Sequence, residues 1–247
     1  IYYINFVRMI LVYIILLFNV VFLKNLTLHN FDNPSANHIL DTEIPHDNSD
    51  LLIIVGMLGG IEFYDISTPE ILNHLDNLTL SGGGGGGGGG GTKPNCIVAS
   101  GDYAYVTTNR GLGVINIANP SNPQYLGIVS GTDNYILEDL DVNSNFLAVA
   151  AHENGTLLFD ITNPEAPNFL TSIEGQNVWT VNLSNDYLYI GDQSTLNIHM
   201  IITDFFDSFV DVVDVSNIIL SNSIKDIETS HYNDYIFVAL GSDGVVM

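Results

Sequence analysis

Seven histidines are the side chains in this sequence best suited to acid–base chemistry or metal binding, and they stand at positions 29, 38, 46, 74, 152, 199 and 231. No H-E-x-x-H motif is present, and no two histidines share a strand at ligand spacing. The segment His152-Glu153-Asn154-Gly155 is typical of a turn. No G-x-S-x-G motif indicates a nucleophilic serine. We therefore predict no catalytic, cofactor-binding or metal-binding residues.

Oxygen-rich loops are the second group of residues that could do chemistry. Asp47-Asn48-Ser49-Asp50 and Gly241-Ser242-Asp243-Gly244 offer the oxygen ligands that calcium prefers. Neither loop has the D-x-D-x-D-G spacing of a calcium loop, so we interpret both as solvated turns and keep calcium as the one cofactor to test. The single cysteine, Cys96, excludes both an intramolecular disulfide and a cysteine-based zinc site.

The charge balance excludes one class of partner. The chain has 28 acidic and 5 basic residues, for a formal net charge of −23. Such a surface repels phosphate backbones, so nucleic acid is not a predicted partner. Hydrophobic residues make up 46% of the sequence, which is enough to form a buried core.

An apolar segment at the N-terminus indicates export. Residues 9–23 are apolar except for Asn19, and Arg8 and Lys24 flank them. This pattern is typical of a signal peptide or signal anchor, which would form a hydrophobic helix. A core helix of the domain is the alternative, but the segment is apolar on all sides. We assign residues 1–24 to the signal and residues 25–44 to a linker, and we expect the membrane to be contacted only through this segment.

A repeated strand pattern fills the rest of the chain. An aromatic residue follows a polar turn at Tyr103, Phe146, Tyr187 and Tyr235, with separations of 43, 41 and 48 residues. A second element recurs at 60–69, 111–120 and 155–164, where a glycine opens an apolar strand and a proline closes it. Proline ends strand pairing, and side chains such as Asp and Asn bond the backbone of a bend. The predicted structural turn residues are Asp65, Asn116, Asp160, Pro69, Pro120 and Pro164.

A period near 44 residues with several short strands predicts an all-β fold, a β-propeller, over residues 45–247. Helical repeats would require a 3.6-residue apolar period, and a β-solenoid would have a shorter repeat. The sequence starts at Ile1 and stops within a repeat at Met247, so we expect a partial propeller of about four to five blades.

The motifs resemble a known repeat family. Gly101–Val106, followed by Gly111–Ile117 and by Asn-Pro-x-x-Pro at 119–123, is similar to the LVIVD repeat, a β-propeller repeat of bacterial and archaeal surface proteins. The resemblance is strong over 97–130 and 141–174. It is weaker after Trp179, where an insertion around 203–211 would restore the register. It implies the propeller fold and brings no catalytic residues with it.

Ten consecutive glycines occupy positions 82–91. Polyglycine cannot pack a sheet, so this run is either a flexible linker or a low-complexity insertion, which includes an artefact of sequence assembly. It is not a phosphate-binding loop, because no Gly-Lys-Ser/Thr sequence follows.

Together these features predict an exported, non-catalytic binding or scaffold module of the cell surface, extracellular or anchored in the membrane. The expected partners are proteins or carbohydrates. The alternative is an exported enzyme, hydrolase-like, that uses the central channel of the propeller; fold alone does not decide between the two.

Overall fold

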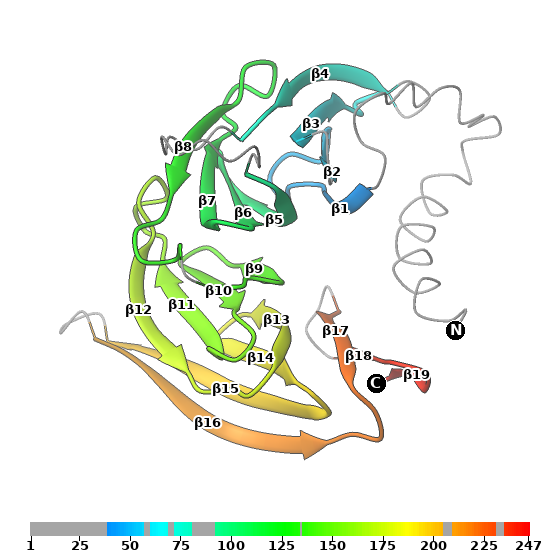
Figure 1. The fold of residues 1–247 in the computed structure, drawn as a ribbon, viewed down its shortest axis with the longest axis vertical. Helices are drawn as coiled ribbons and strands as arrows, with labels where there is room; N and C mark the ends of the chain where they lie inside the picture. Colours follow the sequence, from blue (N-terminus) through cyan, green and yellow to red (C-terminus); the bar gives the residue numbers. More distant parts are fainter. Residues whose placement is uncertain are drawn as a thin grey trace. The chain divides into compact units, whose positions relative to one another are not determined.

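The computed structural model describes residues 39–56, 60–68, 72–80, 92–133, 135–204, 209–230 and 235–247. These residues form strands and turns without a helix, and so none of them could cross a membrane as a helix. Residues 1–24, which the sequence analysis assigned to a signal, and the polyglycine run at 82–91 lie outside the described residues. The strands make five antiparallel sheets in which neighbours in sequence are neighbours in the sheet, as in propeller blades (Figure 1).

The described chain divides into two compact units, and the boundary lies between Tyr135 and Ile136. The first unit holds two blades. Blade 1 contains β1 (Ile39–Glu43), β2 (Leu51–Gly56), β3 (Gly60–Asp65) and β4 (Asn73–Leu78). Blade 2 contains β5 (Pro94–Ser100), β6 (Tyr103–Thr108), β7 (Gly111–Asn116) and β8 (Gln124–Ile128).

The second unit holds three blades. Blade 3 contains β9 (Leu140–Val142), β10 (Phe146–Ala150), β11 (Thr156–Asp160) and β12 (Asn168–Ile173). Blade 4 contains β13 (Val178–Ser184), β14 (Tyr187–Asp192), β15 (Thr195–Asp204) and β16 (Phe209–Ile219). Blade 5 contains β17 (Ile224–Thr229), β18 (Ile236–Leu240) and β19 (Gly244–Val246).

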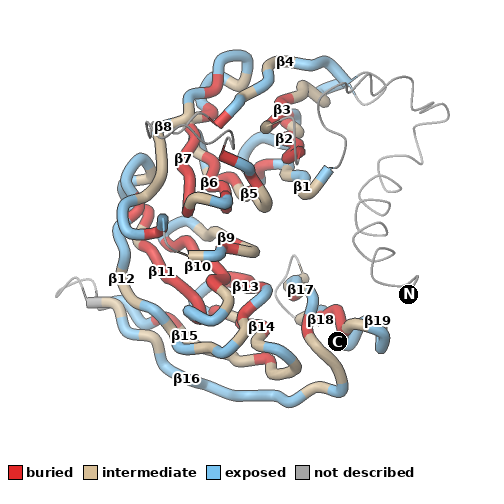
Figure 2. Tube along the Cα trace, viewed as in Figure 1, coloured by how far each residue is buried: buried red, intermediate tan, exposed pale blue. Residues whose placement is uncertain are grey.

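The second and third strands of blades 1 to 3 supply much of the core. Every residue of β10 is buried, and β7 is buried except for its last residue. No described residue of the fourth strands is buried, and Figure 2 draws β4, β12 and β16 in the pale blue and tan of exposed and intermediate positions. Strands that are apolar on both faces pack between sheets, which explains why their sequences read as continuous apolar runs.

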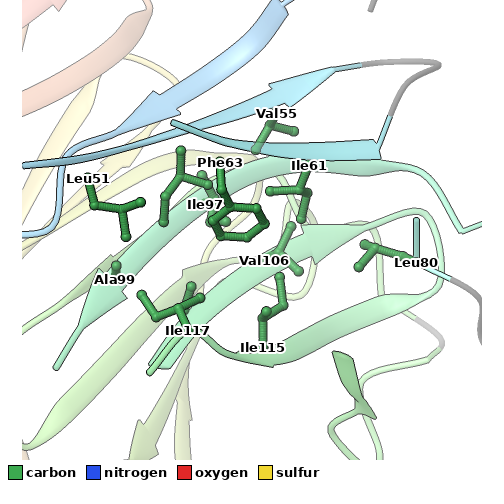
Figure 3. Packing of buried hydrophobic residues seen from close by; sticks show 12 residues of the cluster. Leu51, Val55, Ile61, Phe63, Leu80, Ile97, Ala99, Val106, Ile115 and Ile117 are labelled. Atoms are coloured by element: carbon green, nitrogen blue, oxygen red, sulfur yellow. The ribbon is translucent and has the colours of Figure 1, made fainter. Parts of the chain in front are cut away.

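Apolar side chains from two sheets meet within the first unit. Phe63 and Ile61 of blade 1 pack with Ile97 and Val106 of blade 2, and all four are at most 2% exposed (Figure 3). A fully buried side chain of this size stabilises the fold by about 1.5–3 kcal/mol. Packing of apolar side chains therefore joins the sheets of blades 1 and 2.

Glycine opens the third strand of four blades because the turn requires it. Gly60, Gly111, Gly155 and Gly244 have φ values of 85°, 119°, 74° and 82°. In this left-handed region other residues are strained. At Gly155 a Cβ would collide with the carbonyl oxygen of Ile173, so the neighbouring strand also excludes a side chain.

Two boundaries differ from the sequence analysis. Residues 39–43, which the sequence placed in the linker at 25–44, form β1 and pair with β2. In blade 4 the third strand does not end after Met200, because no Asn-Pro pair stops it, and it continues as a hairpin in which ten residues of β15 pair with β16. The segment around 203–211 is therefore the end of this hairpin, and Val213–Asn217 belongs to the fourth strand, β16.

Candidate ligand-binding site around Trp179

A tight turn in blade 3 contacts the first strand of blade 4. His152 lies in the turn between β10 and β11 with a left-handed φ of 52°. Its backbone N–H donates to Val178 O, and the Val178 N–H donates to His152 O, both at 3.2 Å. This isolated bridge places the imidazole beside the start of β13.

Bulges expose two side chains in the first strands. The register of β13 shifts at Trp179, between Val178 and Thr180. The register of β17 shifts in the same way at Lys225. A bulge leaves a residue unpaired and redirects its side chain. The Lys225 ammonium lies 5.6 Å from the Trp179 ring centroid, within range of a cation–π interaction.

The His152 imidazole is held by two polar partners and one ring. Its Nε2 lies 2.8 Å from Glu138 Oε1, and its Nδ1 lies 2.9 Å from Asn177 Oδ1. Its ring packs edge-on against Trp179, with 4.4 Å between centroids. Two acceptors on one imidazole require the imidazolium ion, or a neutral ring with the Asn177 amide turned over.

Asp192 of β14 fixes the segment that carries Asn177. Its Oδ1 accepts a hydrogen bond from Asn177 N at 2.9 Å, and its Oδ2 accepts one from Gln176 N at 3.0 Å. A carboxylate bonded to two successive backbone N–H groups holds a loop in one conformation. Asn177 is therefore preorganised beside His152.

We call Glu138, His152, Asn177, Trp179 and Lys225 the Trp179 cluster. Trp179 is the only tryptophan of the chain and is 38% exposed, and Lys225 is one of five basic residues. The cluster combines an exposed indole with hydrogen-bond donors and acceptors, which is what a site for a polar organic ligand needs. In the described part of the chain the side-chain partners of His152 include no hydroxyl or thiol nucleophile.

The predicted turn residues lie away from this cluster, at the ends of third strands. Asp65 Oδ1 accepts from Ser67 N at 2.8 Å, Asn116 Oδ1 from Ala118 N at 3.0 Å and Asp160 Oδ1 from Thr162 N at 2.7 Å. Hydrogen bonds from Ser67 hold the pKa of Asp65 below its usual value. Pro120 and Pro164 lie in the bends that follow, and Pro69 lies outside the described residues.

In the two loops considered for calcium, side-chain oxygens accept hydrogen bonds from other groups of the protein. Asp47 Oδ2 accepts from Gly101 N at 3.2 Å, and Asn48 Oδ1 accepts from Asp50 N at 3.3 Å. Asp243 Oδ2 accepts from the Ser221 hydroxyl at 2.7 Å, and the hydrogen bonds around Asp243 lower its pKa. Within the residues that the structure describes, no three His, Cys, Asp or Glu side chains converge as a metal site would require.

Sequence reasoning recognised the turn at His152 but not the cluster. Glu138, His152 and Trp179 are separated by 14 and 27 residues, and only the contact between blades brings them together. The lone tryptophan at the start of a repeat, next to Asn177, was the available signal. Of the other histidines, His46 is exposed, His74 packs against Tyr64 and His199 lies in β15; positions 29, 38 and 231 lie outside the described residues.

The fold defines the class of protein: an all-β chain made of propeller blades. The LVIVD repeat profile matches residues 93–130, 137–174 and 175–198, which cover blades 2 and 3 and most of the first three strands of blade 4. The chain thus contains LVIVD repeats over these residues and has a β-propeller fold, as the sequence analysis expected.

Solved structures agree on the fold. A functionally unknown protein from Desulfotomaculum acetoxidans has a TM-score of 0.61 at 14% identity, over 85% of this chain and 70% of that one. Kluyveromyces lactis Hsv2 has a TM-score of 0.55 at 16% identity, over 82% of this chain and 57% of that one. The dihydro-heme d1 dehydrogenase NirN has a TM-score of 0.52 at 11% identity, over 81% of this chain and 41% of that one.

The chain therefore spans little more than half of the Hsv2 chain that it resembles. At these identities the likeness concerns the fold alone. No curated protein matches the sequence.

Proposed function

We propose that this chain is a non-catalytic binding module of an exported cell-surface protein, and that its ligand is a carbohydrate bound at the Trp179 cluster. The observation that supports this most strongly is the exposed indole of Trp179, which packs against the imidazole of His152 and has the ammonium of Lys225 nearby. An aromatic surface rimmed by fixed donors and acceptors suits the alternating apolar and hydroxyl faces of a sugar.

The surroundings of the cluster favour a sugar over a protein partner. A stable protein interface buries about 800 Å² on each side and has an apolar centre. Beside Trp179 the contacting side chains are polar, and a chain with a net charge of −23 repels acidic partners. A neutral glycan needs neither an apolar patch nor a complementary charge.

Export is the second part of the proposal. It rests on the apolar residues 9–23 between Arg8 and Lys24, which are typical of a signal peptide or signal anchor. Cell fractionation of the full chain tests it, because an exported protein is accessible to protease added outside the cell.

A glycan array tests the ligand class. The chain is expected to retain one class of neutral oligosaccharide, and the Trp179→Ala variant is expected to lose it. Tyr187→Ala is the matched control, since Tyr187 is an aromatic residue of the same blade with 39% exposure. Retention of protein ligands only, or equal binding by the Trp179→Ala variant, would contradict the proposal.

An exported hydrolase is the alternative, and the His152–Glu138 pair is the observation that favours it. A carboxylate that an imidazole 2.8 Å away holds in place, as His152 holds Glu138, can act as a general base on a bound water. This reading predicts turnover of the captured glycan, with loss of turnover but not of binding in Glu138→Gln.

A further inference from the structure

The long hairpin of blade 4 has one side that changes from apolar to polar along its length. In β16, Val210, Val212 and Asp214 occupy alternate positions and therefore project to the same side of the sheet. Across the ladder, Ile201 pairs with Val212 and His199 pairs with Asp214. Because residues directly opposite each other share a face, an imidazole and a carboxylate follow the apolar residues on that side.

A pocket of about 260 Å³ lies between the hairpin and the fourth strand of blade 3. Strand β12 contributes Thr171 and Ile173 to its lining. The hairpin contributes Val212, His199 and Asp214. Ile173 and Val212 also pack against the apolar core of blades 3 and 4. The pocket therefore has an apolar wall and a polar end, and its lining belongs entirely to the second compact unit.

The imidazole of His199 is a half-buried polar group in this pocket. Among the residues that the structure describes, none forms a hydrogen bond with the ring. Burial lowers the pKa of His199, and the charge of Asp214 partly offsets this. The ring is therefore neutral at pH 7, and one of its nitrogens is an acceptor. A ligand with an N–H donor would recover the free energy that a half-buried acceptor loses without a partner.

The lining favours a cation that carries several hydrogen-bond donors. The Asp214 carboxylate, the neutral His199 ring and the Thr171 hydroxyl are all able to accept, and a primary ammonium has three donors. An anion would be repelled by Asp214 and by the net charge of −23. A metal ion would need more ligands, and in the described part of the chain no three His, Cys, Asp or Glu side chains converge.

We propose that this pocket binds a primary ammonium group on an alkyl stem. The ammonium donates to His199 and Asp214, and the stem lies along Ile173 and Val212. At about 260 Å³ the pocket is smaller than the roughly 300–1,000 Å³ of sites for drug-sized ligands, which suits so small a group. The pocket shares no residue with the Trp179 cluster, so the proposal does not depend on the proposed function.

An NMR titration of the full chain with n-pentylamine tests the proposal. The signal followed is the Cε1–H proton of His199, which is assigned by its loss in His199→Gln. At constant ionic strength we expect a saturable shift with a Kd of about 1–10 mM, in the range that so small a ligand can reach. 1-Pentanol has the same stem without the charge and should bind at least about tenfold more weakly.

Variants of the chain locate the amine. Asp214→Asn removes the charge of the pocket and should weaken binding at least about tenfold. Asp186→Asn is the matched control, because Asp186 is an exposed aspartate of the same blade outside the pocket lining. Trp179→Ala should also leave amine binding unchanged, which separates this pocket from the Trp179 cluster. Circular dichroism confirms that the variants are folded, and the comparison with 1-pentanol needs no variant.

A capped lysine distinguishes two sources of the same chemistry. If Nα-acetyl-lysine N-methylamide binds at least as well as n-pentylamine, the site accepts the lysine side chain of a polypeptide. If it binds more weakly, the site is assigned to free amines. Both results support a site for an alkylammonium group.

Three outcomes would overturn the proposal. One is the absence of a saturable shift of the His199 signal up to about 100 mM n-pentylamine. Another is equal binding of 1-pentanol, because the charge would then have no role. The third is an equal loss of amine binding in Asp214→Asn and Asp186→Asn, since the amine would then respond only to the overall negative charge.

Discussion

The imidazole of His152 packs edge-on against the indole of Trp179, with 4.4 Å between their centroids and 62° between their planes. The two residues belong to different blades, and the His152–Val178 backbone bridge holds them together. The contact therefore belongs both to the junction of blades 3 and 4 and to the binding site that we propose there.

His152→Asn should weaken the ligand without disrupting the turn. Asparagine adopts the left-handed conformation that His152 has at φ 52°, but it lacks the imidazole. Loss of the ring that packs against the Trp179 indole and fixes its position predicts an affinity about tenfold lower, measured by calorimetry with the captured glycan. Gln193→Asn is the control, because Gln193 holds the equivalent turn of blade 4 at φ 55°. Equal losses in both variants would show that the effect comes from the turn.

Asp141→Ala should destabilise the junction of blades 3 and 4. The substitution leaves the N–H of buried Leu183 without its acceptor at 2.7 Å. An unsatisfied buried donor costs about 1–3 kcal/mol, which urea denaturation can measure. Asp133→Ala, at an exposed position, should change the free energy of unfolding by less than about 0.5 kcal/mol. An unchanged free energy of unfolding in Asp141→Ala would contradict a structural role for the carboxylates that accept hydrogen bonds from the next blade.

Gly155→Ala should be more harmful than Gly101→Ala. Both glycines have positive φ, at 74° and 57°, but only at Gly155 would a Cβ collide with the neighbouring backbone. We expect losses of about 2–3 kcal/mol at Gly155 and about 1 kcal/mol at Gly101 in thermal or urea unfolding. Equal losses would mean that β12 shifts to accommodate the methyl group.

The fold was largely predictable because a recurring aromatic residue precedes an apolar strand in each repeat. Tyr103, Phe146 and Tyr187 are followed by apolar runs that became β6, β10 and β14, since each must bury both faces between sheets. The strand at 39–43 was missed because Asp41 and Glu43 make it look like a polar linker, although these carboxylates bind the next blade. A sequence does not show that a charged residue faces a backbone donor.

The Trp179 cluster was not predictable for a related reason. Its members come from three blades, and the bulges that expose Trp179 and Lys225 are set by pairing register. The local signals were the glycine at position 155, which marks the turn at His152, and the lone tryptophan at position 179. Contacts between blades depend on the assembled fold, which a single repeat does not encode.

His199 should make stability depend on pH. Burial lowers the pKa of His199, and the nearby Asp214 partly offsets this. The unfolded chain, with a histidine pKa of about 6.5, then binds more protons than the folded chain, so stability is lost as pH falls through 6.5 toward the folded-state pKa.

Replacing the histidine removes this dependence. Urea unfolding of His199→Gln between about pH 7.5 and 5 should show a smaller decrease in stability than the wild type. His46→Gln is the control, because the His46 side chain is 88% exposed. An identical pH profile for wild type and His199→Gln would contradict the burial of this imidazole.

The most direct test of the binding site is the emission of Trp179 itself, since the chain has one tryptophan and its signal needs no label. Titration with the oligosaccharide captured on the array is predicted to change the emission saturably, with the Kd found by calorimetry and an affinity about tenfold lower in His152→Asn. Calorimetric binding with unchanged Trp179 emission would contradict the account, because the sugar would then bind elsewhere on the chain.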